Sequence, residues 1–458
     1  MKFKPGFSAQ LPTQSFLERN VQEPFLRFHE PEPDIEIPYE VRDRHIFIAG
    51  MTRHGKSTLI ENMALQDIEN GEGVCLIDPK GDSVKNILAR IPESRKNDCI
   101  YINLSTPIPM DFMSYEDPDE KEALVGNLKY ILHKVGFAPR MEGILYNVIY
   151  TLFEANDHLP AEKRATFLDI YNFFRDPECQ RRIIDALPDD SPMRLEWKKM
   201  PSDEAIAPIL NRMTPFVRTE SLRAIFGAAK PELHITDVMN ERKILLVDLG
   251  GIGESKQMFG SLLVAKIQQS AFRRHSIPIE ERVPFHLYID EFQNFQTEDN
   301  AFENILSMAG GFGLRLTLAN QYVNQLSSEV KGAVLGNVST YILFKLGGES
   351  AHVLSEKVLP YEWQALTALP PHYAMFAIPG REVVIAKTPP PAPRAQISYA
   401  EDIKKRTVKK YACNSSEVRQ DERNEHRNTG AKPEPEPSGA PGLLPSLQDD
   451  KSDADDPR

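Results

Sequence analysis

The stretch Ile46-Phe47-Ile48-Ala49-Gly50-Met51-Thr52-Arg53-His54-Gly55-Lys56-Ser57-Thr58 decides the fold of this chain. An apolar run ends in Gly50, and Gly55, Lys56 and Ser57 follow after four more residues, which is the spacing of a phosphate-binding loop. Glycines let the backbone curl around a phosphate with its N–H groups turned inward. Lys56 reaches the β- and γ-phosphates, and Ser57 offers its hydroxyl to Mg²⁺. We therefore predict that Gly50–Thr58 binds a nucleoside triphosphate with Mg²⁺.

Short apolar runs on either side of this loop alternate with helical patterns. The segment after the loop has Ile60, Met63, Ala64 and Ile68 on one helical face. Apolar strand-like runs occupy 45–49, 74–77, 99–104, 243–249, 285–289, 314–318 and 340–346, and 374–378 and 383–386 are spaced as a closing hairpin. Alternation of strand and helix predicts an α/β fold with a central, mostly parallel sheet flanked by helices.

The chain divides into five regions by pattern. We expect an extended arm over 1–40, a nucleotide-binding domain in two parts over 41–115 and 236–390, and an all-α inserted domain over 116–235. Residues 391–458 are predicted to be a disordered, charged, Pro-rich tail, because such a composition buries too little apolar surface to fold alone. The basic residues between Lys404 and Lys410 are typical of a solvated helix face, with contact to DNA, a membrane or a partner as the alternative.

Composition excludes several classes of protein. The net charge of −12 does not fit a protein that coats DNA with a broadly basic surface, although a basic channel can lie inside an acidic assembly. The four cysteines show no CxxC spacing, so we expect no disulfide framework or zinc site. The sequence shows no signal peptide and no apolar run long enough to cross a bilayer. These features predict a soluble, cytoplasmic protein.

Polar residues stand where several predicted strands end, and ligands bind at that edge of an open α/β sheet. Asp290 and Glu291 follow the strand 285–289. Asp290 is predicted to hold Mg²⁺, and Glu291 to accept a proton from the attacking water. Gln321 follows the next strand and is predicted to sense the γ-phosphate, with a turn residue as the alternative. Asp78-Pro79-Lys80-Gly81-Asp82 forms a good tight turn, and its charges at a strand end suggest a further role.

Arg315 lies within the strand that leads to Gln321. In a ring of identical subunits it could act on the γ-phosphate of a neighbour as an arginine finger. The alternative is a surface arginine on an edge position.

Taken together, these motifs resemble the HerA/FtsK branch of RecA-like P-loop NTPases, and most closely the TraG/TraD-type coupling ATPases of type IV secretion and conjugation. The segments that carry the resemblance are Gly50–Thr58, Leu76–Asp82, Val247–Leu263, Leu287–Phe295 and Gly313–Leu326. The resemblance implies a hexamer that hydrolyses ATP between subunits and translocates DNA through a central channel. It assigns Lys56 and Ser57 to nucleotide and Mg²⁺, Asp290 and Glu291 to hydrolysis, Gln321 to sensing and Arg315 to the trans finger.

Two departures from this pattern affect the interpretation. The loop has Thr52-Arg53-His54 where the family usually has Thr-Gly-Ser, which could alter nucleotide affinity. The transmembrane hairpin typical of conjugative coupling proteins is missing, so either a membrane-anchored secretion-system subunit holds the protein at the inner membrane or it works as a soluble motor.

Three functions remain open at this point. The first is a coupling ATPase that translocates DNA in conjugation or type IV secretion. The second is a soluble translocase of the same fold in repair, packaging or defence, or an ATPase that powers secretion. The third is a nucleotide-dependent scaffold with little turnover.

Overall fold

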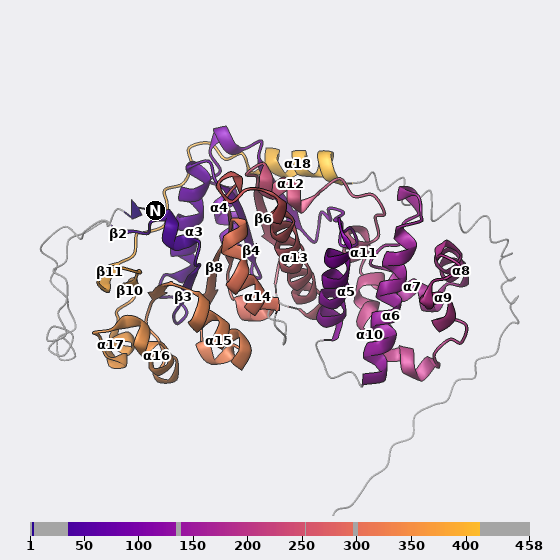
Figure 1. The fold of residues 1–458 in the computed structure, drawn as a ribbon. Helices are drawn as coiled ribbons and strands as arrows, with labels where there is room; N and C mark the ends of the chain where they lie inside the picture. The colour runs from indigo at the N-terminus through magenta and orange to yellow at the C-terminus, as the bar shows by residue number, and fades with distance from the viewer. Residues whose placement is uncertain (1, 4–34, 134–138, 252, 296–300, 413–458) are drawn as a thin grey trace, which may run out of the picture. The chain divides into compact units, whose positions relative to one another are not determined.

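A computed structural model describes residues 2–3, 35–133, 139–251, 253–295 and 301–412. Its central feature is a nine-stranded sheet with the order β11-β10-β9-β3-β8-β7-β4-β6-β5 (Figure 1). The seven strands from β9 to β5 in this order run parallel, and β10 and β11 join them as an antiparallel hairpin. The strands span Ile46–Ala49 (β3), Gly73–Asp78 (β4), Cys99–Asn103 (β5), Ile244–Asp248 (β6), Phe285–Ile289 (β7), Leu314–Asn320 (β8), Thr340–Leu343 (β9), Tyr373–Ala377 (β10) and Val384–Lys387 (β11). The predicted α/β class and the closing hairpin are confirmed.

Both faces of the sheet are covered, which explains why its strands are continuous apolar runs. Alternate residues of each strand enter two separate hydrophobic clusters: Ile46 and Ile48 face one way, and Phe47 and Ala49 the other. The first face packs against α3 (Lys56–Glu69) and α4 (Asp82–Leu88), and the second against α13 (Glu254–Phe272), α14 (Ala301–Met308) and α15 (Ser328–Asn337). Two shorter helices, α16 (Gly348–Leu354) and α17 (Trp363–Ala368), follow β9.

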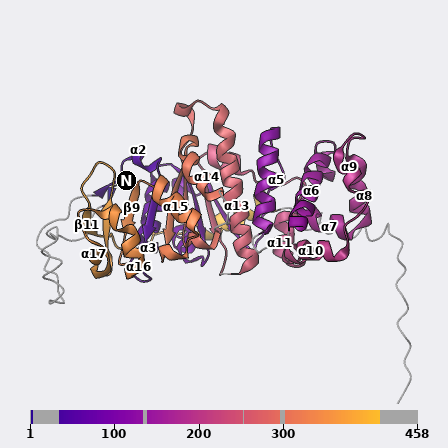
Figure 2. The ribbon, with the colours of Figure 1, turned by 60° about the horizontal axis from the view of Figure 1, so that its bottom comes forward.

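Between β5 and β6 the described regular elements are helical. They are α5 (Pro118–His133), α6 (Pro139–Asn156), α7 (Asp169–Arg175), α8 (Pro177–Ala186), α9 (Pro192–Glu196), α10 (Asp203–Arg218), α11 (Glu220–Phe226) and α12 (Ile235–Asn240). In both views α13 lies between the sheet and α5 (Figures 1 and 2), and Glu120 of α5 accepts a hydrogen bond from Arg273 at 2.6 Å. One hydrophobic cluster contains both this helical region and a face of the sheet. The division into separate domains stays a prediction.

The predicted disorder of 391–458 is wrong for its first part, because Ala400–Tyr411 forms helix α18 against β5. Ile403, Thr407 and Tyr411, spaced four residues apart, are buried on one face, and the lysines lie on the rest of the helix. The Thr407 hydroxyl accepts the backbone N–H of Tyr101 at 3.3 Å, which satisfies a donor on the outer edge of β5. The apolar stripe therefore outweighs the charged composition. Residues 413–458 lie outside the described part of the chain.

The predicted arm over 1–40 lies mostly outside the described residues. Within it, Lys2–Phe3 (β1) pairs with Ile35–Glu36 (β2) in antiparallel register, and α2 (Tyr39–Arg42) leads into β3. Among the helices of the described ranges, none combines the length and the hydropathy that a membrane span requires. Cys75, Cys99 and Cys179 are buried free thiols.

Candidate nucleotide site

The loop between β3 and α3 has the backbone geometry that its sequence predicts. Gly55, directly before α3, has a φ of 109°, in the left-handed region that glycine adopts freely. A Cβ on Gly50 would lie 2.4 Å from the Cβ of Phe344, so a larger residue does not fit there. The N–H of Gly50 donates to the carbonyl of Asn320, and the N–H of Met51 to that of Lys345. The loop is thus fixed to the strand ends on both sides of β3.

The Thr52-Arg53-His54 departure leaves this unit of strand, loop and helix intact. Arg53 has a φ of 63° and an exposed side chain. A ring nitrogen of His54 lies 2.8 Å from the carbonyl oxygen of Thr52, and the His54 carbonyl accepts the N–H of His372 at 3.0 Å. The two bulky residues are therefore accommodated, at the cost of a left-handed conformation at Arg53.

Lys56 opens α3 and lies within the loop. Its ammonium donates to the carbonyl of Gly50 at 2.6 Å, and the residue is 6% exposed. Burial lowers the pKa of Lys56, and the carboxylates of Glu291 and Asp290 oppose that shift. A buried lysine at the positive end of a helix is suited to bind phosphate.

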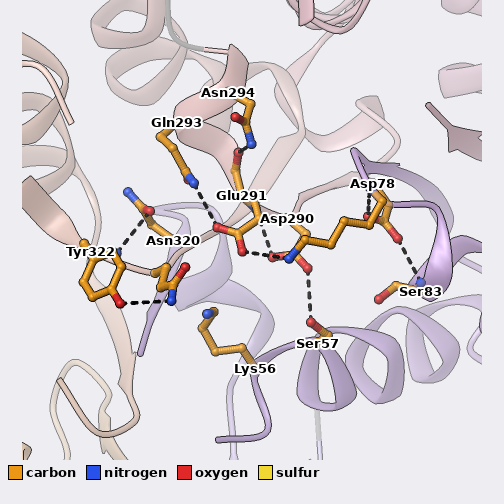
Figure 3. A network of polar contacts seen from close by, with 12 residues as sticks. Lys56, Ser57, Asp78, Ser83, Asp290, Glu291, Gln293, Asn294, Asn320 and Tyr322 are labelled. Atoms are coloured by element: carbon orange, nitrogen blue, oxygen red, sulfur yellow. Dashed lines mark hydrogen bonds and ion pairs between the residues drawn. The ribbon is translucent and has the colours of Figure 1, made fainter. Parts of the chain in front are cut away.

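Asp290 and Ser57 meet across the site (Figure 3). The Ser57 hydroxyl donates to an oxygen of Asp290 at 3.2 Å. Burial, together with the neighbouring carboxylates Glu291 and Asp78, raises the pKa of Asp290 to about 6. A buried, mutually repelling carboxylate pair next to a hydroxyl suits Mg²⁺, which binds one or two carboxylates and takes its other ligands from phosphates and water. Ser57 and Asp290 therefore fit the predicted metal.

Glu291 is held more tightly than its sequence position suggests. Its φ is 48°, a left-handed conformation that is unusual outside glycine, and its N–H donates to Asp290 at 2.9 Å. One carboxylate oxygen of Glu291 accepts the Nζ of Lys80 at 3.3 Å, and the other accepts the amide of Gln293 at 2.9 Å. The side chain is 8% exposed. Such fixed orientation is what a general base requires.

The end of β8 differs from the prediction in one respect. Gln321 is partly exposed, and its amide donates to the hydroxyl of Tyr322 at 3.1 Å. Asn320, which we did not single out, is fully buried directly beside Ala49 in the register of β3 and β8. Its Oδ1 accepts the N–H of Tyr322, while its Nδ2 has no hydrogen-bond partner within the described ranges (Figure 3). The sequence signal that could have identified it is an amide side chain at the carboxyl end of the strand, directly before Gln321.

Arg315 is not brought to this site. It lies near the start of β8, whereas the phosphate loop lies beyond the carboxyl ends of the strands. Its Nε donates to Asp43 at 2.6 Å. The Arg315 side chain is 11% exposed. This placement favours a structural role within one chain, and the trans role stays a prediction.

The Asp78–Asp82 turn lies beside Asp290 and Glu291. The two oxygens of Asp78 accept the N–H groups of Lys80 and Ser83, each at 2.8 Å. Asp78 thus fixes the turn and the start of α4, as the tight-turn interpretation requires.

Comparisons with known proteins agree with this geometry. Residues 284–362 match the family described as the "TraM recognition site of TraD and TraG". No curated protein matches the chain. Three similar solved structures are the plasmid coupling protein TrwB with a non-hydrolysable ATP analogue (15% identity, TM-score 0.59, 87% of this chain and 97% of that one), unbound TrwBΔN70 (15%, 0.57, 86% and 96%) and VirB4 of Thermoanaerobacter pseudethanolicus (14%, 0.53, 85% and 98%).

The fold predicted from the sequence is therefore confirmed as that of a RecA-like P-loop NTPase. The family match over residues 284–362 supports the resemblance to TraG/TraD-type coupling ATPases in that segment, and the solved structures support the fold.

Proposed function

We propose that this chain hydrolyses ATP with Mg²⁺ and uses the free energy to translocate DNA as the coupling ATPase of a type IV secretion or conjugation system. One observation carries the proposal: Lys56, Ser57, Asp290 and Glu291, from two segments more than 230 residues apart, converge at one edge of the sheet. The relatives support it, because TrwB is described as a conjugative coupling protein and has been solved with ADP and Mg²⁺.

The chemistry follows from the positions of the side chains. Lys56 and the loop N–H groups bind the phosphates and balance the charge that develops on them. Glu291 accepts a proton from the attacking water, whose oxygen forms a bond to the γ-phosphorus. The bond from that phosphorus to the β–γ bridging oxygen breaks, and its electron pair leaves with ADP. Ser57 and Asp290 would hold Mg²⁺, which when bound would supply Lewis-acid stabilisation of the phosphate oxygens.

We further propose a homo-oligomer, on the family pattern a hexamer, in which DNA passes through a central channel without sequence readout. Arg315 would then act on a neighbouring subunit's nucleotide, and Gln321 would report on the γ-phosphate of its own. The protein would work in the cytoplasm, with a separate membrane-anchored subunit linking it to a secretion channel.

ATP hydrolysis with and without DNA tests the function. We expect the wild type to turn over ATP faster with DNA. We expect Lys56→Ala to lose nucleotide binding, and Glu291→Gln to bind nucleotide while losing about 10²–10⁴-fold in turnover. Lys85→Ala is the control, because Lys85 is 57% exposed and pairs with Asp248 outside the nucleotide site. If DNA gave no stimulation and both variants equalled the wild type, the motor function would be wrong.

A further inference from the structure

The Asp78–Asp82 turn presents a lysine to the nucleotide site, and the phosphate-binding assignment leaves this lysine without a role. The backbone N–H of Lys80 is bound by Asp78 at 2.8 Å. Gly81, the next residue, has a φ of 83°, and a Cβ there would lie 1.9 Å from an oxygen of Asp248. The backbone on both sides of Lys80 is therefore fixed, so the position from which its side chain extends is fixed as well.

From that position Lys80 reaches the residue assigned as general base. Its Nζ lies 3.3 Å from Oε1 of Glu291, while Gln293 binds Oε2 at 2.9 Å. The two contacts hold the Glu291 carboxylate from both of its oxygens. Lys80 is thus placed to orient this carboxylate, which lies on a residue with a left-handed backbone.

The exposure and charge of Lys80 distinguish it from a purely structural ion pair. Its side chain is 53% exposed, against 8% for Glu291, and its hydrogen bond to Glu291 uses one of the three N–H donors of the ammonium. Burial would lower the pKa of Lys80, but the carboxylates of Glu291, Asp290 and Asp78 raise it above its usual value. The ammonium of Lys80 is therefore charged at neutral pH. An exposed pair of this kind contributes little to stability, about 0–1 kcal/mol.

Hydrogen bonds connect Lys80 to the phosphate loop. Lys80 binds Glu291, the N–H of Glu291 donates to Asp290, and Asp290 accepts the hydroxyl of Ser57, the residue after Lys56. Lys56 itself lies against the loop carbonyl of Gly50. A terminal phosphate carried by the loop would therefore be an anion within this network, which Lys80 enters from the Asp78–Asp82 turn.

We propose that Lys80 is a positioning residue that couples Glu291 to the terminal phosphate of ATP. One N–H donor of Lys80 orients the Glu291 carboxylate, and another binds the γ-phosphate. The general base and the phosphate are thereby held in position relative to each other. This role rests on the proposed ATPase function. It predicts that Lys80 distinguishes nucleoside triphosphate from diphosphate and supports turnover more than binding.

The test compares Lys80→Met, Lys80→Arg and the control Lys85→Met, a lysine of similar exposure that pairs with Asp248 at 3.6 Å. We measure kcat and KM for ATP, Kd for ADP and for the non-hydrolysable analogue ADPNP, and the thermal midpoint. Lys80→Met should lower kcat about 10²-fold, leave the Kd for ADP within twofold, and abolish the preference for ADPNP over ADP. Lys80→Arg should recover part of kcat because it keeps the charge, and Lys85→Met should match the wild type.

Two results would overturn the role of Lys80: a Lys80→Met variant with kcat and ADPNP preference equal to the wild type, or one that loses ADP and ADPNP affinity equally with a lower thermal midpoint. Failure of the ATPase function would look different. A wild type that binds nucleotide without turnover would contradict the proposed function, and the ADPNP preference of Lys80→Met would still decide the role of Lys80. A wild type that binds no nucleotide would contradict both.

Discussion

Strand β7 and helix α3 meet at two polar clusters, one at each end, and the two clusters differ in how well their members are paired. At the nucleotide end Ser57 donates to Asp290 at 3.2 Å, and three carboxylates lie close together. At the other end Arg42 forms two hydrogen bonds of 2.7 Å to Asp67, and it also contacts His286 at 2.8 Å and the hydroxyl of Tyr288 at 3.1 Å. Tyr288 in turn donates to Asp67.

The second cluster is closed. Each of its four residues is at most 2% exposed, and its charges are opposite and directly bonded. The nucleotide cluster instead gathers like charges and includes a lysine with half of its side chain in solvent. Buried charges that are paired with each other hold two elements together. Like charges gathered at a strand end repel each other, and a ligand of opposite charge that binds there removes this repulsion. We therefore expect the Arg42–Asp67 cluster to stabilise the fold and the cluster around Asp290 to serve ligand binding. Mutations in the two clusters test this difference.

The largest effect is expected at the closed end. Asp67→Ala leaves Arg42 buried without its carboxylate and should lower the free energy of unfolding by about 3–5 kcal/mol. The double variant Arg42→Met with Asp67→Leu should lose less, because both charges are removed. Urea unfolding measures both. An Asp67→Ala loss below that of the double variant would show that the cluster does not act as a pair.

Stability at acidic pH should fall by about 4 kcal/mol between pH 7.5 and pH 5 through two buried histidines. Burial lowers the pKa of His45 to about 4 and that of His286 to about 3. The unfolded chain takes up protons at these groups near pH 6.5, while the folded chain stays neutral there until about pH 4. The stabilisation is therefore complete above pH 6.5 and is lost as the pH falls, by about 2 kcal/mol for each histidine at pH 5.

The measurement is made in an Asp290→Asn variant. The raised pKa of Asp290 would increase the unfolding free energy as the pH falls over the same range, and would therefore offset part of the effect of the histidines. Adding His286→Gln should remove about half of the decrease in unfolding free energy. If urea unfolding gave the same stability at both pH values, the histidines would not be buried in their neutral form.

At the nucleotide end, replacement of a charge should stabilise the protein. Without nucleotide or Mg²⁺, Asp290→Asn removes a carboxylate whose pKa burial and two neighbouring acids raise to about 6. We expect the unfolding free energy at pH 7.5 to rise by about 3 kcal/mol while ATP hydrolysis is lost, the usual exchange of stability for function at such a site. Unfolding in EDTA and an ATPase assay on one preparation test both parts. A destabilised variant would place Asp290 among the structural charges.

The smallest effect on stability is expected for Arg315→Ala. Its partner Asp43 is 44% exposed, so loss of the pair should cost about 1 kcal/mol. The hydrolysis rate then separates the two interpretations of this residue. Retained turnover would assign Arg315 to the structural end of the sheet, whereas a loss of about 10³-fold or more with the fold intact would support its trans role.

The fold could be predicted from the sequence because its signals are local, and local patterns are also the basis on which the principal site residues are predicted. The spacing from Gly50 to Ser57, the apolar strands and the Asp290-Glu291 pair at a strand end each follow from backbone geometry or from burial on both faces of a sheet. The order in which they occur predicted a hydrolytic site without knowledge of any distance. Local patterns failed for α18, because the three buried residues of that helix are spread through a highly charged segment.

Tertiary structure alone decided which polar residues pair. Lys80 binds Glu291 across 211 positions of sequence, and Arg42 binds Asp67, His286 and Tyr288 from elements that no local pattern connects. The burial of Asn320 could not be predicted from the sequence for the same reason, because it depends on the strands beside β8. The sequence by itself thus determined that Gly50–Thr58 has the spacing of a phosphate-binding loop between a strand and a helix. Only packing decided which charges are neutralised and which remain available to a ligand, because charge pairing depends on distances that sheet assembly creates.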